Sequence, residues 1–114
     1  KTLTSGDSGK KFTLNAAAGV AITLPSVAVE GFNARFTVGA AFATTNFTVV
    51  SPTSVIQGSA DVNSTLVPAS NENTISFVAS AETIGDYIEI YSDGTNYYAY
   101  GIAAAAGGIT FTAV

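Results

Sequence analysis

Four residue types are absent from this 114-residue chain: cysteine, histidine, tryptophan and methionine. The lack of cysteine excludes disulfides and thiolate metal sites. The lack of histidine removes the commonest general base and the commonest transition-metal ligand. We therefore expect no metal and no cofactor, and most known catalytic constellations cannot be assembled from the residues that remain.

Charge is also scarce, because charged residues make up 11% of the chain, against about a quarter in an average domain. The net charge is −4, and the basic residues are Lys1, Lys10, Lys11 and Arg35. These few cations cannot build a phosphate-binding patch, so we expect no nucleic-acid partner and no binding to an anionic membrane. A charge-poor surface suits a protein that buries much of its exterior against other subunits.

The acidic residues are the groups left for acid–base chemistry. They are Asp7, Glu30, Asp61, Glu72, Glu82, Asp86, Glu89 and Asp93. No two stand at a spacing that by itself places a carboxylate pair across a cleft, and acidic side chains are mostly solvated. We expect no catalytic residue and no enzymatic activity. The alternative, a hydrolase with a carboxylate pair, requires the fold to bring two of these residues together.

Period-two alternation of apolar and polar residues recurs along the chain between turn-rich segments. It predicts strands at residues 11–15, 20–24, 32–38, 46–50, 54–57, 74–78, 86–91, 97–102 and 109–113. No window has a sustained helical period. The long uncharged segments 36–60 and 94–114 are interrupted too often by polar residues and glycine to be membrane helices. The pattern predicts an all-β fold, either a small antiparallel β-sandwich or a jelly-roll-like barrel.

Residues 10–114 are predicted to form a single β domain behind a flexible N-terminal arm of residues 1–9. The polar start of the chain has no apolar core of the kind that a signal peptide needs. Residues 58–73 are polar and rich in turn formers, so a long loop is expected there. The sequence Asp-Gly-Thr-Asn at 93–96 predicts a short hairpin turn. The alternative, a fragment of a calcium loop, would need further alternating acids and a distal Glu.

All five tyrosines cluster on this hairpin: Tyr87, Tyr91, Tyr97, Tyr98 and Tyr100. Such a cluster packs neighbouring strands together, or it forms an interface or a sugar-binding platform, and the sequence leaves both readings open. Alternation puts Tyr98 and Tyr100 on one face with Ile102. We therefore assign these two tyrosines to the core and Tyr97 to the surface, as an interface residue.

Several short motifs occur in an order that resembles a β-rich module of tailed-bacteriophage virion proteins. They are Thr4-Ser-Gly-Asp-Ser-Gly-Lys-Lys-Phe-Thr-Leu14, Ala21-Ile-Thr-Leu-Pro25, Gly31-Phe32, Val55-Ile-Gln-Gly58 and Ser92-Asp-Gly-Thr-Asn-Tyr-Tyr-Ala-Tyr-Gly101. The module occurs in capsid decoration (cement) proteins and in trimeric fibre domains, and the likeness extends from Ser5 to Gly101. The usual Trp of the last hairpin is replaced here by Tyr97 or Tyr98.

The resemblance implies a structural function without chemistry. Decoration proteins of this kind are homotrimers on the outer surface of the virion capsid, where they bridge neighbouring subunits of the major capsid protein. Their terminal arms often add a strand to the capsid protein, and Lys1, Thr2, Leu3 and Thr4 are expected to do so through main-chain hydrogen bonds. A frayed terminus is the alternative for these four residues. The alternative function is a receptor- or carbohydrate-binding β domain of a fibre or spike, with recognition by Tyr97 and the 58–73 segment.

Overall fold

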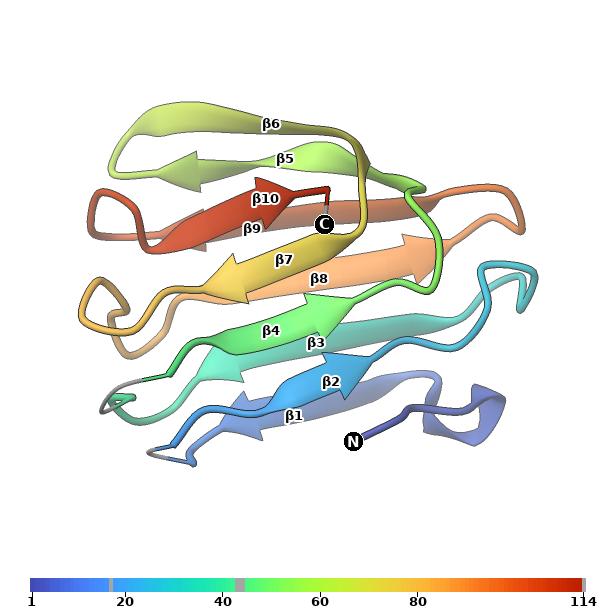
Figure 1. Ribbon diagram of the computed structural model, residues 1–114, viewed down its shortest axis with the longest axis horizontal. Coiled ribbons are helices and arrows are strands. Elements are labelled where there is room, and N and C mark those ends of the chain that lie inside the picture. The colour runs from blue at the N-terminus through green and yellow to red at the C-terminus, as the bar shows by residue number, and fades with distance from the viewer. Residues whose placement is uncertain (17, 43–44, 114) are drawn as a thin grey trace.

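The computed structural model describes residues 1–16, 18–42 and 45–113. In these residues two sheets pack face to face as a β-sandwich, and the one helix is a short 3-10 turn, Ser5–Asp7 (Figure 1). The strands are β1 (Lys10–Leu14), β2 (Ala21–Thr23), β3 (Asn33–Val38), β4 (Phe47–Val50), β5 (Ile56–Val62), β6 (Thr65–Glu72), β7 (Thr74–Phe77), β8 (Tyr87–Ser92), β9 (Tyr97–Ala103) and β10 (Ile109–Thr112). The predicted all-β sandwich is confirmed. No helix in the described residues is long and apolar enough to cross a membrane.

The two sheets are mixed rather than purely antiparallel. The order is β1-β3-β8-β9-β5-β6 in the six-stranded sheet and β10-β7-β4-β2 in the four-stranded sheet, which forms the front layer in Figure 1. Strand β1 pairs with β3, β2 with β4, and β5 with β9, all in parallel. Parallel neighbours need a crossover connection. At the start of the chain this connection is a strand of the opposite sheet, because β1, β2, β3 and β4 alternate between the two layers.

The core lies between the two sheets. The alternation of apolar and polar residues along the strands predicted many of the side chains that are buried there. The predicted core residues that are confirmed as buried are Phe32, Ala34, Phe36 and Val38 at β3, and Ile75 and Phe77 in β7. Aromatic contacts fix the packing: the rings of Phe42 and Phe47 lie 4.6 Å apart between centroids. Each large apolar side chain buried in this way stabilises the fold by about 1.5–3 kcal/mol.

Residues 58–73 form a hairpin, so the prediction of a long loop there was wrong. Strands β5 and β6 pair antiparallel between Ile56 and Glu72, with a register shift between Ile56 and Gly58. Asn63 and Ser64 make the turn between them with φ of 51° and 64°, the left-handed geometry that suits tight hairpin turns. Strand β6 lies at the sheet edge, and its side chains are mostly exposed. The sequence is polar because solvent covers this strand, and Pro68 is tolerated there because an edge strand has unpaired positions.

Residues 1–4 do not form a separate flexible arm. The N–H of Leu3 donates to the carbonyl of Thr23, and the N–H of Thr23 donates to the carbonyl of Lys1, both at 2.8 Å. Thr2 thereby forms a parallel bridge with Thr23 at the outer edge of β2. The side chain of Leu3 is 1% exposed and belongs to the core. Burial of this one apolar residue, which the polar composition of the segment obscured, holds the N-terminus against the sandwich.

Candidate functional site

The acidic side chains mostly serve the fold. Asp86 is buried and accepts hydrogen bonds from the backbone N–H groups of Thr83 and Ala104, at 2.9 and 3.0 Å. Glu82 accepts from the N–H of Phe42 at 3.2 Å. Within the described residues, no three Asp or Glu side chains gather in a way that could hold a metal ion. The contacts of Asp86 and Glu82 are those of side chains that fasten loops to the sandwich.

Residues 93–96 form the hairpin turn predicted from their sequence. Asp93 Oδ1 accepts hydrogen bonds from the N–H groups of Thr95 and Asn96, at 2.9 and 2.8 Å. Its Oδ2 accepts from the Tyr98 hydroxyl at 3.2 Å. The backbone hydrogen bonds from Asn96 and Thr95 lower the pKa of Asp93 below its usual value. Both carboxylate oxygens are thus occupied by the turn and the adjacent strand.

Tyr97 is fully buried, so the prediction that it lies on the surface was wrong. Its ring meets Phe32 edge to face, and its hydroxyl donates to the carbonyl of Pro25 at 2.6 Å. The length of the turn explains this orientation. Four turn residues separate Ser92 from Tyr97, and these two residues pair across the hairpin, so the Tyr97 side chain points inward like that of Ile90. Strand β9 therefore presents Tyr97 and small residues to the core and its bulky residues to solvent.

The outward side of the six-stranded sheet, here called the tyrosine face, carries the other four tyrosines. Neighbouring strands align its side chains in rows across the sheet: Lys11, Arg35, Glu89, Tyr100 and Ser59 in one row, Thr13, Thr37, Tyr87, Ile102 and Asp61 in the next, and Asn33, Tyr91, Tyr98 and Gln57 in the third. Tyr91, Tyr100 and Ile102 are each about half exposed. The assignment of Tyr98 and Tyr100 to the core was therefore wrong, and the tyrosine cluster is largely a surface feature.

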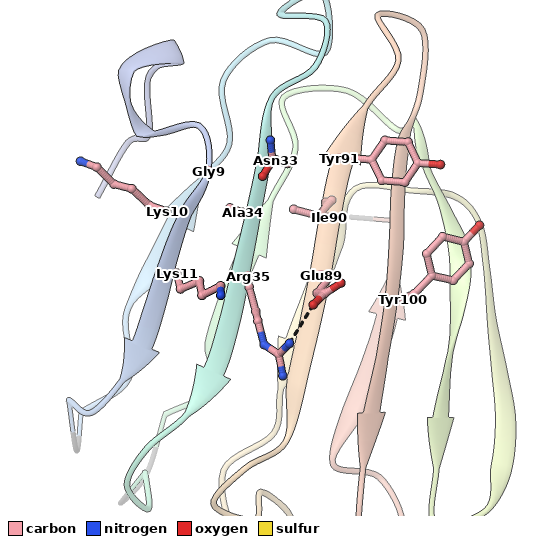
Figure 2. A pocket seen from close by; sticks show the side chains of 10 residues that line it. All are labelled: Gly9, Lys10, Lys11, Asn33, Ala34, Arg35, Glu89, Ile90, Tyr91 and Tyr100. Carbon is pink, nitrogen blue, oxygen red and sulfur yellow. Dashed lines mark hydrogen bonds and ion pairs between the residues drawn. The ribbon is translucent and has the colours of Figure 1, made fainter.

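A shallow hollow of about 260 Å³ opens on the tyrosine face (Figure 2). It is lined by Gly9, Lys10, Lys11, Asn33, Ala34, Arg35, Glu89, Ile90, Tyr91 and Tyr100. In Figure 2, Lys11 reaches from β1 toward β3, whereas Lys10 points the opposite way. Lys10 pairs with Asp7 at 2.8 Å, and this contact lowers the pKa of Asp7. The functional groups that face the hollow thus come from four strands: β1, β3, β8 and β9.

Among the residues that the structure describes, one of the cations at the hollow has no carboxylate partner. Arg35 Nη1 donates to Glu89 Oε1 at 2.7 Å, and its guanidinium lies 4.1 Å from the centre of the Tyr87 ring. In the described part of the chain no carboxylate pairs with Lys11. The hollow therefore has a net positive charge in a chain whose net charge is −4.

The opposite face of the molecule, the outward side of the four-stranded sheet, has a different character. We call it the threonine face. Its side chains are Ala21, Thr23, Thr48, Val50, Thr74, Ser76, Thr110 and Thr112, and the Thr2 bridge extends it by one residue. No Asp, Glu, Lys or Arg occurs in any of the four strands. Figure 1 looks onto this side of the molecule, where the four strands form the front layer.

Comparisons with protein-family models, curated proteins and solved structures found no match. The predicted interface residues Lys1, Thr2, Leu3 and Thr4 lie at the edge of the threonine face, but Leu3 is buried and cannot contact a partner. Sequence reasoning missed the threonine face and the hollow, because each is assembled from strands that are distant in the chain. The sequence does show that the four strands of the threonine face lack charged residues. It does not show the order of these strands in the sheet or which of their side chains point to the same side.

Proposed function

We propose that this chain is a non-catalytic structural protein of a phage particle, which binds the outer surface of the capsid and bridges neighbouring capsid subunits. The observation that carries the proposal is the threonine face, whose four strands contain no charged residue. The resemblance to phage decoration proteins supports the same function. In this proposal the protein is a homotrimer, and its partner is the major capsid protein.

An uncharged sheet face is suited to contact with another protein. Surfaces designed to keep a domain soluble carry about 25–35% charged residues, whereas the buried centres of interfaces are depleted in charge. Burying an unpaired charge carries a large desolvation cost, and the threonine face avoids that cost. Its central side chains, Thr74 and Ser76, are only 9% and 8% exposed. The contact surface therefore comes from the more exposed residues around them, such as Thr48, Thr110 and Thr112. Threonine hydroxyls can form hydrogen bonds across the contact while their methyl groups pack.

The edge beside the threonine face supports a second mode of attachment. Thr2 bridges to β2 on one side and has no strand on its other side within the described residues. An extended segment of the capsid protein can add there through main-chain hydrogen bonds. The N-terminal residues would then act as the outermost strand of the docking sheet, and not as an arm that leaves the domain.

Quantitative mass spectrometry of purified particles tests the proposal. We expect about one copy of this chain per copy of the major shell protein, together with a trimeric mass for the isolated protein by native mass spectrometry. A ratio of a few copies per particle would assign the chain to a fibre or spike. Its absence from washed particles would refute a virion function.

A further inference from the structure

The hollow on the tyrosine face has no part in the proposed docking. It lies on the outward side of the six-stranded sheet, opposite the threonine face, so docking through the threonine face does not cover it. Its volume of about 260 Å³ is below the roughly 300–1,000 Å³ of pockets for drug-sized ligands and cofactors. A ligand that fits it is correspondingly small, such as a single unit of a larger polymer.

The polar groups at the hollow require both negative charge and hydrogen-bond donors from a ligand. Among the described residues no carboxylate pairs with Lys11, so its ammonium group favours a carboxylate from a ligand. Glu89 uses Oε1 for Arg35, and within the described residues its Oε2 has no hydrogen-bond donor. Asn33 donates from Nδ2 to Ser8 Oγ and to the Gly31 carbonyl, so its Oδ1 is left as an acceptor. A ligand must therefore present a carboxylate to Lys11 and hydroxyl groups to Glu89 and Asn33.

Aromatic side chains supply the remaining wall. Tyr91 and Tyr100 line the hollow from β8 and β9, and their exposed fractions are 48% and 49%. A tyrosine ring offers an apolar surface and a hydroxyl that hydrogen-bonds at the same time. The apolar face of a sugar ring packs on such a surface, while the ring hydroxyls reach the polar groups beside it.

We propose that the hollow binds one carboxylated sugar unit of an anionic polysaccharide, such as a hexuronic acid. Lys11 pairs with the sugar carboxylate, Glu89 and Asn33 accept hydrogen bonds from sugar hydroxyls, and Tyr91 and Tyr100 contact the ring. This binding does not depend on the proposed capsid function, because it uses the other face of the isolated domain. A protein located on a particle surface would expose the hollow to the medium.

A phosphate fits the same groups less well, because its oxygens accept hydrogen bonds and leave Glu89 and Asn33 without donors. An acidic peptide has backbone N–H donors, but a run of acidic residues has no apolar ring face to pack on Tyr91 and Tyr100. The Glu89 carboxylate also repels a second negative charge placed in the hollow. Arg35, the side chain best suited to a phosphate, is already held by Glu89 at 2.7 Å.

Titration of ¹⁵N-labelled protein with trigalacturonic acid, followed by NMR, tests the proposal. We expect saturable shifts of the backbone signals of Lys11, Asn33, Arg35 and Tyr100, with little change in strands of the threonine face. The fully methyl-esterified trisaccharide keeps the rings and removes the charge, so it should bind about fivefold more weakly, as expected for loss of one exposed ion pair. Equal binding of both sugars, or no shift with either, would overturn the proposal.

Two variants and two controls locate the contacts. Lys11→Gln should weaken binding of the acidic trisaccharide about fivefold and leave the methyl ester unaffected, whereas Tyr100→Ala should weaken both. Lys1→Gln removes the same charge elsewhere and should have no effect. A triglutamate peptide serves as the last control: if it binds the same residues as tightly as the sugar, the site recognises acidic peptide and the saccharide assignment is wrong.

Discussion

Replacement of Tyr97 tests the inward orientation of β9. Its ring is fully buried against Phe32, and its hydroxyl donates to the Pro25 carbonyl at 2.6 Å. Tyr97→Phe removes only this hydrogen bond, which should cost about 0.5–1.5 kcal/mol. Tyr97→Ala removes the ring as well, and large-to-small changes of buried aromatic side chains cost about 3–5 kcal/mol. Because domains of this size are stable by about 5–15 kcal/mol, the alanine variant should be close to unfolding.

Urea denaturation and thermal unfolding measure these differences, with Tyr100 as the matched control. Tyr100 is on the same strand but half exposed, so Tyr100→Ala should change stability by less than about 1 kcal/mol. Tyr97→Phe should lower the Tm by roughly 4 °C. If Tyr100→Ala is as damaging as Tyr97→Ala, the orientation of β9 described above is wrong.

The pH dependence of stability gives a second readout of the same burial. Burial raises the pKa of Tyr97 from 10.0 to about 12. A folded-state pKa above the unfolded value means that the folded protein holds the proton more tightly. Stability from this group is therefore complete below pH 10 and falls as the pH rises from about 10 to 12. The stability advantage of the wild type over Tyr97→Phe should shrink and then reverse across that range, because the loss implied by a pKa raised from 10.0 to about 12 exceeds the contribution of one hydrogen bond. A constant difference would contradict the burial.

Three further stability predictions follow from single contacts, each measured by urea denaturation. Leu3→Ala should cost about 2–4 kcal/mol because Leu3 is in the core; a change under about 0.5 kcal/mol would mean that the N-terminus is detached. Gly58→Ala should lower the free energy of unfolding by about 3 kcal/mol or more, because Gly58 has φ of +122° and a Cβ there would overlap the Ala99 carbonyl. A variant as stable as the wild type would refute the pairing register of β5 with β9. Asp86→Ala should cost about 2–3 kcal/mol, because two backbone N–H groups lose their acceptor; an unchanged midpoint would contradict its role as a loop anchor.

Local alternation predicted the strands well where one side faces the core and the other faces solvent. The run from Phe32 to Val38 is the clearest case, because its apolar residues recur at every second position and all of them are buried. In β9 the same rule misled, because both sides of the strand carry aromatic residues. Its orientation is set by the pairing of Ser92 with Tyr97 across the turn, which the number of turn residues could have indicated.

The candidate surfaces were less predictable than the strands. The hollow combines Lys11, Arg35, Glu89 and Tyr100, which become neighbours through a parallel pair and two antiparallel pairs. No spacing in the sequence indicates this row. The parallel pairing of β1 with β3 depends on β2 crossing to the other sheet, which is a property of the whole chain. Composition predicted a charge-poor exterior. That the uncharged side chains gather on one face could not be predicted without the order of the strands in the sheet.

Binding of variants to particles stripped of the wild-type chain tests the proposed function most directly. Thr48→Lys puts a charge in the middle of the threonine face, and Thr13→Lys puts the same charge on the tyrosine face. Both positions are outward-facing strand residues, so both variants should fold, which their thermal unfolding will verify. We expect Thr48→Lys to weaken particle binding by roughly 30-fold or more, as an unpaired buried charge does, and Thr13→Lys to bind like the wild type. Loss of binding by Thr13→Lys alone would contradict docking through the threonine face.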